Sequence, residues 1–261
     1  MKAMIGRIRR WLRLLLFPPV CRFCGKRQSI FVRTLPQVLC PDCLKSWAEQ
    51  TKRLCPSCAA PYFRCRCMPA SLEKSGAQGL VKLTVYRPGS CSVTASLLLR
   101  AKDAPDKEVF RFLSLELMMP VFQACRELGI DVQSVLLTYA PRTRRNRIVV
   151  GHDQARELSR LLAGWLGCSF GELFFRKRRA PSQKALSSAD RVKNAQASIE
   201  LKRGVSVKDR TVIVLDDICT SGATLAGCTD KLYQAGAACV LTACVAQAQG
   251  GAPAKRVTKK R

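Results

Sequence analysis

Hydrophobic positions change their period along the chain, and the change predicts strands alternating with helices. The residues Val212, Ile213, Val214 and Leu215 form an unbroken apolar run, which is typical of a strand buried on both faces of a parallel sheet. Strands are expected at residues 80–86, 135–140, 173–175, 211–215 and 239–246. Amphipathic helices are expected at residues 92–101, 107–128 (kinked near Pro120), 153–166, 189–195 and 223–235. This order predicts an α/β fold with a mainly parallel sheet and helices on both faces.

The first 17 residues differ from this pattern. Apolar residues such as Ile5, Ile8 and Leu12 recur at helical spacing with arginines between them, which predicts a basic amphipathic helix at residues 1–17. It could lie on a membrane surface or an acidic partner, although packing on its own domain is the favoured interpretation. No apolar run approaches the roughly 20 residues that a membrane-spanning helix needs.

Eight of the 15 cysteines lie in close pairs between residues 21 and 67. The predicted ligands are Cys21, Cys24, Cys40, Cys43, Cys55, Cys58, Cys65 and Cys67. Their spacing predicts two structural zinc sites, in a double zinc ribbon at residues 18–70. Which pairs share a metal stays open, and a cross-braced arrangement is an alternative. Four thiolates leave no coordination position for water, so the zinc is expected to act as a scaffold, with nucleic-acid contact by nearby arginines as the alternative.

The compartment and the charge follow from composition. Paired cysteines without a secretory leader predict a cytoplasmic protein. The chain has 45 Lys and Arg against 18 Asp and Glu, a net charge of +27, which should attract phosphates, nucleic acid or anionic lipid. Two basic clusters stand out: Arg142, Arg144, Arg145 and Arg147, and then residues 176–179. They are either solvated loops, or binding sites for diphosphate or single-stranded nucleic acid.

The most informative stretch follows the apolar run at residues 211–215. Asp216 and Asp217 come directly after it, and the small residues Thr220, Ser221, Gly222, Ala223 and Thr224 then open a predicted helix. Ligands of open α/β sheets bind at this end of a strand, and the N-terminus of a helix offers N–H groups to a phosphate. An ordinary strand with an N-capped helix is the alternative. The loop matches neither the Walker nor the dinucleotide-binding motif.

These motifs resemble those of the ComF family, in which a zinc-binding cysteine module precedes a type I phosphoribosyltransferase-like domain. The similarity extends over residues 17–246. Its motifs are the cysteine pairs, Tyr86, the set Arg178-x4-Gln183-x2-Leu186-x4-Arg191-x2-Asn194, and the loop at 216–224. The transferase-like domain is expected at residues 79–248, followed by a disordered basic tail at 249–261.

The resemblance implies a function and roles for the loop residues. Thr220, Ser221, Gly222, Ala223 and Thr224 would cradle the 5-phosphate of phosphoribosyl pyrophosphate or a nucleotide. Asp216 and Asp217 would face the ribose hydroxyls as the catalytic pair, and magnesium would neutralise the diphosphate that an acceptor displaces. Cys219 is expected to be a small packed residue. The alternative is a non-catalytic module that binds single-stranded DNA or partner proteins in DNA uptake during natural competence.

One stretch departs from the family pattern. Pro141, Gly151 and Gln154 match it, whereas the usual Phe-Asn pair is replaced by His152 and Asp153. This segment should border the substrate side, so the acceptor is expected to differ or turnover to be weak. His152 is the sole histidine and could act as a general base, although a surface or helix-terminal role is favoured.

Overall fold

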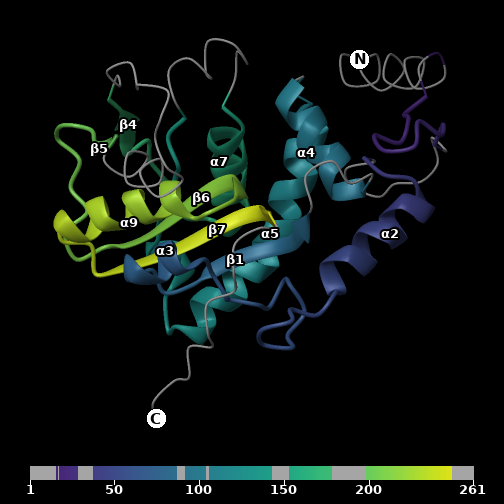
Figure 1. Cartoon of the computed structure of the whole chain (residues 1–261). Coiled ribbons are helices and arrows are strands. Elements are labelled where there is room, and N and C mark those ends of the chain that lie inside the picture. Colours follow the sequence, from purple (N-terminus) through teal and green to yellow (C-terminus); the bar gives the residue numbers. More distant parts are fainter. Residues whose placement is uncertain are drawn as a thin grey trace, which may run out of the picture.

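We analysed a computed structural model that describes residues 16, 18–28, 38–86, 92–103, 106–142, 153–177 and 198–248, with only the backbone at 86, 102 and 103 (Figure 1). Several predictions fall outside these ranges. They concern the helix at 1–17 apart from Leu16, the helix at 189–195, the basic tail at 249–261 and the whole motif-bearing segment 178–194. They also concern Arg144, Arg145 and Arg147 of the first basic cluster, Gly151 and His152.

The centre of the fold is a parallel sheet of five strands in the order β1-β7-β6-β2-β3. Its strands are β1 (Leu80–Tyr86), β2 (Leu136–Tyr139), β3 (Ser169–Phe170), β6 (Thr211–Cys219) and β7 (Cys239–Ala248). Every pairing between neighbours is parallel. The predicted fold class, a mainly parallel α/β sheet, is confirmed.

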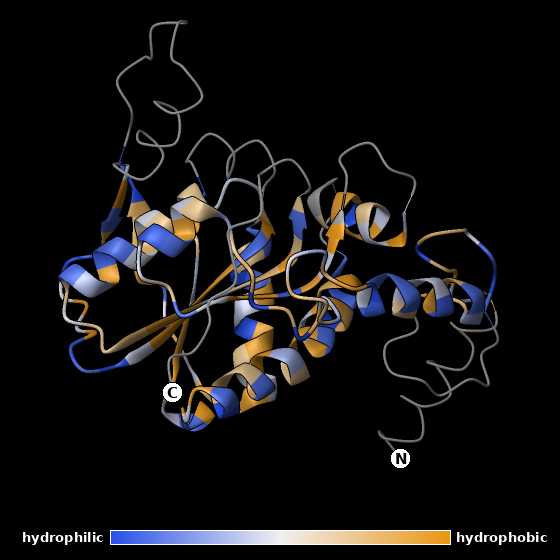
Figure 2. Ribbon diagram, turned by 60° about the horizontal axis from the view of Figure 1, so that its bottom comes forward, coloured by the Kyte–Doolittle hydropathy of each residue, from blue (hydrophilic) through white to orange (hydrophobic). Residues whose placement is uncertain are grey.

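Helices cover both faces of this sheet, as Figures 1 and 2 show. One layer contains α4 (Val93–Asp103), α5 (Lys107–Glu127) and α7 (Gln154–Leu166), and the other contains α3 (Ala70–Lys74) and α9 (Ala223–Gln234). Ile213 and Leu215 of β6 pack on the first layer, whereas Val212 and Val214 pack on the second. Because both faces are buried, the strand needs apolar residues at consecutive positions.

The cysteine-rich segment joins the core of the sheet through a helix that the hydrophobic pattern did not reveal, α2 (Pro41–Lys52). Its residue Trp47 is 1% exposed. The Trp47 indole stacks at a tilt on Phe112 of α5, with 5.3 Å between ring centroids, and donates a hydrogen bond to Glu116 at 2.8 Å. The segment around the first four cysteines therefore shares a hydrophobic core with the first helix layer.

One predicted strand does not belong to the main sheet. Residues 173–175 were expected to add a parallel strand, but β4 (Phe174–Arg176) pairs antiparallel with β5 (Ile199–Leu201) in a separate two-stranded sheet. The edge position beside β2 is taken by the two-residue strand β3. Such a short strand produces almost no hydrophobic period, which explains why the pattern missed it.

The helix α5 continues through Pro120 to Glu127. None of the helices in the described part of the chain has the length and apolar character that crossing a bilayer requires.

Candidate functional site

The carboxyl ends of β2 and β6 lie side by side. The two strands are parallel neighbours, with Tyr139 opposite Leu215. The segment that leaves β2, which contains Pro141 and Arg142, is therefore brought close to Asp216 and the residues that follow it. This is the edge where ligands of open parallel sheets bind.

Asp216 and Asp217 both lie within β6, which extends to Cys219, four residues beyond the predicted end. Burial, together with the adjacent Asp217 carboxylate, raises the pKa of Asp216 well above its usual range. The Asp217 backbone N–H donates to Asp216 Oδ1 at 2.9 Å. Two neighbouring carboxylates in this position are costly to keep charged without a cation or a hydrogen-bond donor.

Arg142 supplies such a cation to Asp217. Its Nη2 donates to a carboxylate oxygen of Asp217 and to Oε1 of Gln154, and its Nε lies 4.0 Å from Asp153. Gln154 is 1% exposed, and its Nε2 has no hydrogen-bond partner within the described residues. A buried amide donor without an acceptor is costly in the free protein, so this corner of the site contains a donor that a ligand oxygen would satisfy.

The predicted phosphate-binding loop forms the turn between β6 and α9. Thr220 and Ser221 are exposed, and Gly222 is the N-cap of α9 with a φ of 77°. Only glycine adopts this left-handed conformation without appreciable strain. Ala223 and Thr224 begin the helix, whose first N–H groups have no acceptor within it. The five loop residues thus surround the N-terminus of a 12-residue helix.

Arg176 adds a second cation beside the loop. From β4 it donates through Nε to the carbonyl of Pro141 at 2.7 Å and through Nη2 to Thr224 Oγ1 at 3.0 Å. The guanidinium therefore bridges the segment after β2 and the first turn of α9. The sequence analysis identified this arginine only as part of a basic cluster, because its contacts depend on the separate β4–β5 sheet.

Cys219, the last residue of β6, is 2% exposed. Burial and the nearby Asp216 raise the pKa of its thiol to about 12. The side chain is consequently a buried, protonated thiol at neutral pH, which is a poor nucleophile.

The eight paired cysteines form two groups, each with its four sulfur atoms within 4.8 Å of one another. The first group contains Cys21, Cys24, Cys40 and Cys43, and the second contains Cys55, Cys58, Cys65 and Cys67. The sulfurs of Cys24 and Cys40 are 3.7 Å apart, close to the edge of about 3.8 Å expected for a tetrahedron with Zn–S bonds of about 2.3 Å. Each cysteine that the structure describes is a free thiol. The cross-braced alternative is not adopted, because each group is made of consecutive pairs.

Backbone N–H groups favour the thiolate form of one cysteine in each group. Burial opposes the charge on Cys21, but N–H groups of Cys24, Cys40 and Phe23 outweigh it and lower its pKa to about 6. The same balance, with N–H groups of Ser57 and Cys58, lowers the pKa of Cys55 to about 7. Thiolates are the form that binds metal.

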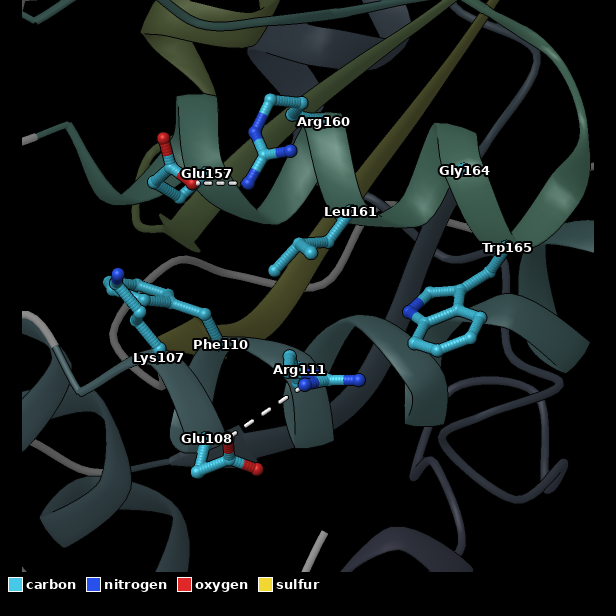
Figure 3. Close-up of a pocket in the computed structure, with 9 residues that line it drawn as sticks. All are labelled: Lys107, Glu108, Phe110, Arg111, Glu157, Arg160, Leu161, Gly164 and Trp165. Carbon is cyan, nitrogen blue, oxygen red and sulfur yellow. Dashed lines mark hydrogen bonds and ion pairs between the residues drawn. The ribbon is translucent and has the colours of Figure 1, made fainter. Parts of the chain in front are cut away.

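A hollow of about 500 Å³ lies elsewhere, between α5 and α7 (Figure 3). Its charged residues are largely paired with one another: Arg160 contacts Glu157 at 3.0 Å, and Arg111 contacts Glu108 at 3.9 Å. The loop residues at 220–224 do not line it. It is therefore a feature separate from the site at the end of β6.

Comparisons with known proteins agree with this architecture. A family model described as "Phosphoribosyl transferase domain" matches residues 151–261. The chain is 27% identical over 210 residues to "DNA utilization protein YhgH" of Escherichia coli O6:H1, covering 79% of this chain and 89% of that protein. It is 28% identical over 214 residues to the protein of the same name from Salmonella typhimurium, with the same coverage.

Among solved structures, a purine phosphoribosyltransferase from Pyrococcus horikoshii aligns with 52% of this chain and 74% of its own, at 17% identity and a TM-score of 0.34. A phosphoribosylpyrophosphate synthetase from Mycobacterium smegmatis aligns at 16% identity and a TM-score of 0.32 over 51% of this chain, which spans only 33% of the synthetase. The matched relatives, the match to the transferase-domain model and the two groups of four cysteines together confirm the resemblance to the ComF family found in the sequence, in which a cysteine-rich segment lies ahead of a phosphoribosyl transferase domain.

Proposed function

We propose that the protein binds phosphoribosyl pyrophosphate or a nucleotide at the carboxyl end of β6. The observation that carries this proposal is the arrangement of Asp216, Asp217 and the Gly222 turn between the cations Arg142 and Arg176. Carboxylates suited to hydroxyl groups, free N–H groups and two arginines occupy one edge of the sheet. A phosphorylated pentose has complementary groups, and the family-model match over residues 151–261 supports the assignment.

Each part of the site has a role in this proposal. The N–H groups and hydroxyls of residues 220–224 bind the 5-phosphate, and Arg176 adds positive charge beside Thr224. Asp216 and Asp217 accept hydrogen bonds from the ribose hydroxyls. Magnesium, when bound with the diphosphate, supplies charge neutralisation, and carboxylate oxygens such as those of this pair are of the kind that this hard cation prefers.

A transfer reaction is the further step of this proposal. An acceptor would displace diphosphate at the anomeric carbon of the ribose, and the chain's residues would contribute by positioning the two reactants and stabilising the leaving charge. Arg142 contacts the Asp217 carboxylate, and in this proposal its guanidinium exchanges that partner for the leaving diphosphate. No covalent nucleophile is needed, which is consistent with the buried thiol of Cys219.

We also propose that each cysteine group holds one zinc ion as a structural element. The arrangement of four sulfur atoms in each group, with 3.7 Å between those of Cys24 and Cys40, supports this identity. Free thiols throughout the described residues fit a reducing cytoplasm.

Calorimetry with purified, metal-replete protein tests the ligand. Phosphoribosyl pyrophosphate with Mg²⁺, ribose 5-phosphate and AMP are titrated separately into the parent protein and into Asp216→Asn plus Asp217→Asn. We expect binding to the parent and a loss of about tenfold or more in the variant. Absence of heat with all three compounds would overturn the proposal. Release of diphosphate with a candidate acceptor then tests for transfer.

A second candidate function is a non-catalytic module that binds single-stranded DNA or partner proteins in DNA uptake. The net charge of +27 and the name of the matched relatives, "DNA utilization protein", favour it. Such binding should weaken steeply with salt, and it should survive Asp216→Asn plus Asp217→Asn. A fluorescence anisotropy titration with a labelled oligonucleotide at two salt concentrations distinguishes this function from binding at the carboxylate pair.

A further inference from the structure

The short helix α3 lies directly against the phosphate-binding loop. The Ser71 hydroxyl donates a hydrogen bond to the carbonyl of Ser221, 150 residues further along the chain. A Cβ atom at Gly222 would lie 3.1 Å from Ser71 Oγ, 3.2 Å from Pro69 Cβ and 3.3 Å from Leu72 Cβ. The outer side of the turn is thus closed by Ser71 and Leu72 of α3 and by its N-cap, Pro69.

The hydrogen bond from Ser71 fixes the orientation of the peptide unit between Ser221 and Gly222. A peptide unit is planar and trans, so its carbonyl and the next N–H point in opposite directions. Since Ser71 holds the Ser221 carbonyl towards α3, the N–H of Gly222 points in the opposite direction within the peptide plane, towards the buried Cys219 thiol. Ser71 is therefore a positioning residue for the segment proposed to bind the phosphate.

The same helix is connected to the second cysteine group by only two residues. Cys67, the last member of that group, is followed by the buried Met68 and by Pro69, the N-cap of α3. The carbonyl of Cys67 accepts a hydrogen bond from Nζ of Lys82, a lysine of β1 that is 1% exposed. Little freedom remains between the sulfur cluster and Ser71, because the Cys67 carbonyl is bonded to β1 and the side chains of Met68 and Leu72 are buried in the core on the α3 side of the sheet.

Arg66 strengthens this connection. Its guanidinium donates to the carbonyls of Phe63 and Cys65 at 3.3 and 3.4 Å, and to the carbonyl of Pro120 in α5 at 3.4 Å. The peptide that carries Cys65 and Cys67 is thus attached to α5 and β1 as well as to α3. Displacement of the two cysteines would have to move α3 relative to the loop.

We propose that metal occupancy of the second cysteine group controls the conformation of the phosphate-binding loop, with Ser71 as the residue that transmits it. The part of this inference that concerns ligand binding rests on the function proposed above. Metal binding orders the peptide at 65–67, which places α3 so that Ser71 fixes the Ser221–Gly222 peptide. Coupling between two binding sites is reciprocal, so a phosphate bound in the loop must in turn raise the metal affinity of this group. We expect the higher affinity to appear as slower release of the metal.

The first cysteine group provides an internal control. It is covered by α2 and packs with Phe112 and the rest of the α5 layer. Three of its four cysteines, Cys21, Cys40 and Cys43, belong to the hydrophobic cluster on the opposite face of the sheet from α3 and α9. Metal loss from this group should leave the loop unchanged.

The first experiment needs no ligand. Amide hydrogen exchange at residues 218–226 is measured by mass spectrometry in the parent protein and in the single-site variants Cys58→Ser and Cys24→Ser, which each disrupt one group at one of its less buried cysteines. We expect exchange in this segment to accelerate at least about fivefold, the lower range of common couplings, in Cys58→Ser but not in Cys24→Ser. Equal exchange in both variants overturns the proposal.

The second experiment uses the parent protein, so it does not depend on whether a cysteine variant folds. Release of zinc to a colorimetric chelator is followed with and without ribose 5-phosphate, in the absence of Mg²⁺ to keep the chelator free. We expect one of the two release phases to slow at least about fivefold. Ser71→Ala should abolish this slowing, whereas Ser71→Thr, which keeps the hydroxyl, should restore part of it.

The outcomes separate the two proposals. If calorimetry detects ribose 5-phosphate binding but neither release phase changes, the coupling is wrong and the ligand site stands. If no phosphorylated pentose binds, the proposed function fails, and the hydrogen-exchange comparison alone decides whether metal and loop are coupled. If Ser71→Ala binds the ligand and slows zinc release as the parent does, Ser71 is not the transmitting residue and the proposal fails.

Discussion

Arg142 and Asp217, 75 positions apart in the chain, form an ion pair at the carboxyl edge of the sheet. Their side chains are only 16% and 17% exposed, so the pair is shielded from solvent more than a surface ion pair. Gln154 completes the arrangement by accepting a second hydrogen bond from the same guanidinium nitrogen. The pair therefore both stabilises the fold and holds one carboxylate of the proposed ligand site.

We predict that Arg142→Ala lowers the free energy of unfolding by about 1–3 kcal/mol, because it leaves the Asp217 carboxylate and the Gln154 carbonyl oxygen without their donor. Arg142→Lys should recover only part of this loss, since one ammonium cannot reproduce the planar guanidinium contacts. Urea unfolding measures the free energy of unfolding of both variants. The matched control is Arg160→Ala, an exposed arginine paired with Glu157 one helical turn away, for which about 0.5 kcal/mol or less is expected. An Arg142→Ala protein as stable as this control would contradict the prediction.

The positions of the main strands follow from local pattern, whereas the contacts of the site do not. β1 was predicted with its observed ends because an alternating apolar segment ends at Tyr86. β6 was predicted four residues too short, because Asp216 and Asp217 interrupt its apolar run although the backbone stays extended. A strand can continue through polar residues when its neighbours still supply hydrogen bonds, as β7 does here.

The loop residues could be identified from sequence because strand, acidic pair and glycine turn are consecutive. The residues that contact the loop and its carboxylates could not be identified from sequence, since Arg142, Arg176 and Ser71 belong to segments that are distant in the chain. The hydrophobic period of a local segment contains no information on such long-range contacts. The helix α3 lies at the boundary between the two predicted domains and was not predicted, because five residues are too few for a helical period to be recognised.

A second prediction concerns Gly222. Its φ of 77° and the close approach of α3 both disfavour a side chain. Gly204 has the same backbone conformation, φ 78°, but nothing within 4 Å of the position where a Cβ would lie. Gly204→Ala should thus report the conformational cost alone, about 1–2 kcal/mol.

Gly222→Ala should cost more than Gly204→Ala in the free energy of unfolding, because Pro69 and Ser71 must also move. It should weaken ribose 5-phosphate binding, whereas Gly204→Ala should leave that binding unchanged. Thermal and urea unfolding of the two variants, followed by calorimetry, measure these differences. Equal destabilisation by both substitutions would show that α3 does not press on the loop.

A third prediction concerns metal content. Elemental analysis of protein purified under reducing conditions should find about two zinc ions per chain, and about one in either Cys24→Ser or Cys58→Ser. Finding no zinc in the parent would overturn the metal assignment for both groups.

Trp47 offers a local probe of the first group, because the 1% exposed indole lies on the helix that starts one residue after Cys40. In a Trp11→Phe plus Trp165→Phe background, Trp47 is the sole tryptophan. Its emission should shift to longer wavelength when Cys24→Ser is added, but not when Cys58→Ser is added. The opposite order would mean that α2 depends on the second group rather than on the first.

The last prediction concerns the two adjacent carboxylates. Asp216 is buried beside another acid, whereas Asp217 is paired with the Arg142 guanidinium. The pKa of Asp216 is raised above its usual range in the folded protein by burial and by Asp217. The folded state therefore retains the proton of Asp216 to higher pH than the unfolded chain, whose Asp pKa is about 3.9. The contribution of Asp216 to the free energy of unfolding must fall as pH rises from the unfolded pKa through the folded one. Asp216→Asn, which stays neutral, should remove this decline and make the ligand-free protein more stable than the parent at pH 7.

Asp217→Asn should have the reverse effect at pH 7, because it breaks the ion pair with Arg142 and leaves a shielded guanidinium without its carboxylate. Urea unfolding of both variants and the parent at pH 7 and at the lowest pH where all three remain folded gives the comparison. The difference between Asp216→Asn and the parent should shrink at the lower pH, since the parent's carboxyl is then protonated in both states. Both variants should nevertheless lose ligand binding. A stability gain combined with a loss of binding is the signature of a carboxylate kept for its ligand at a cost to the fold, and an Asp216→Asn protein less stable than the parent at neutral pH would show that Asp216 contributes to the fold instead.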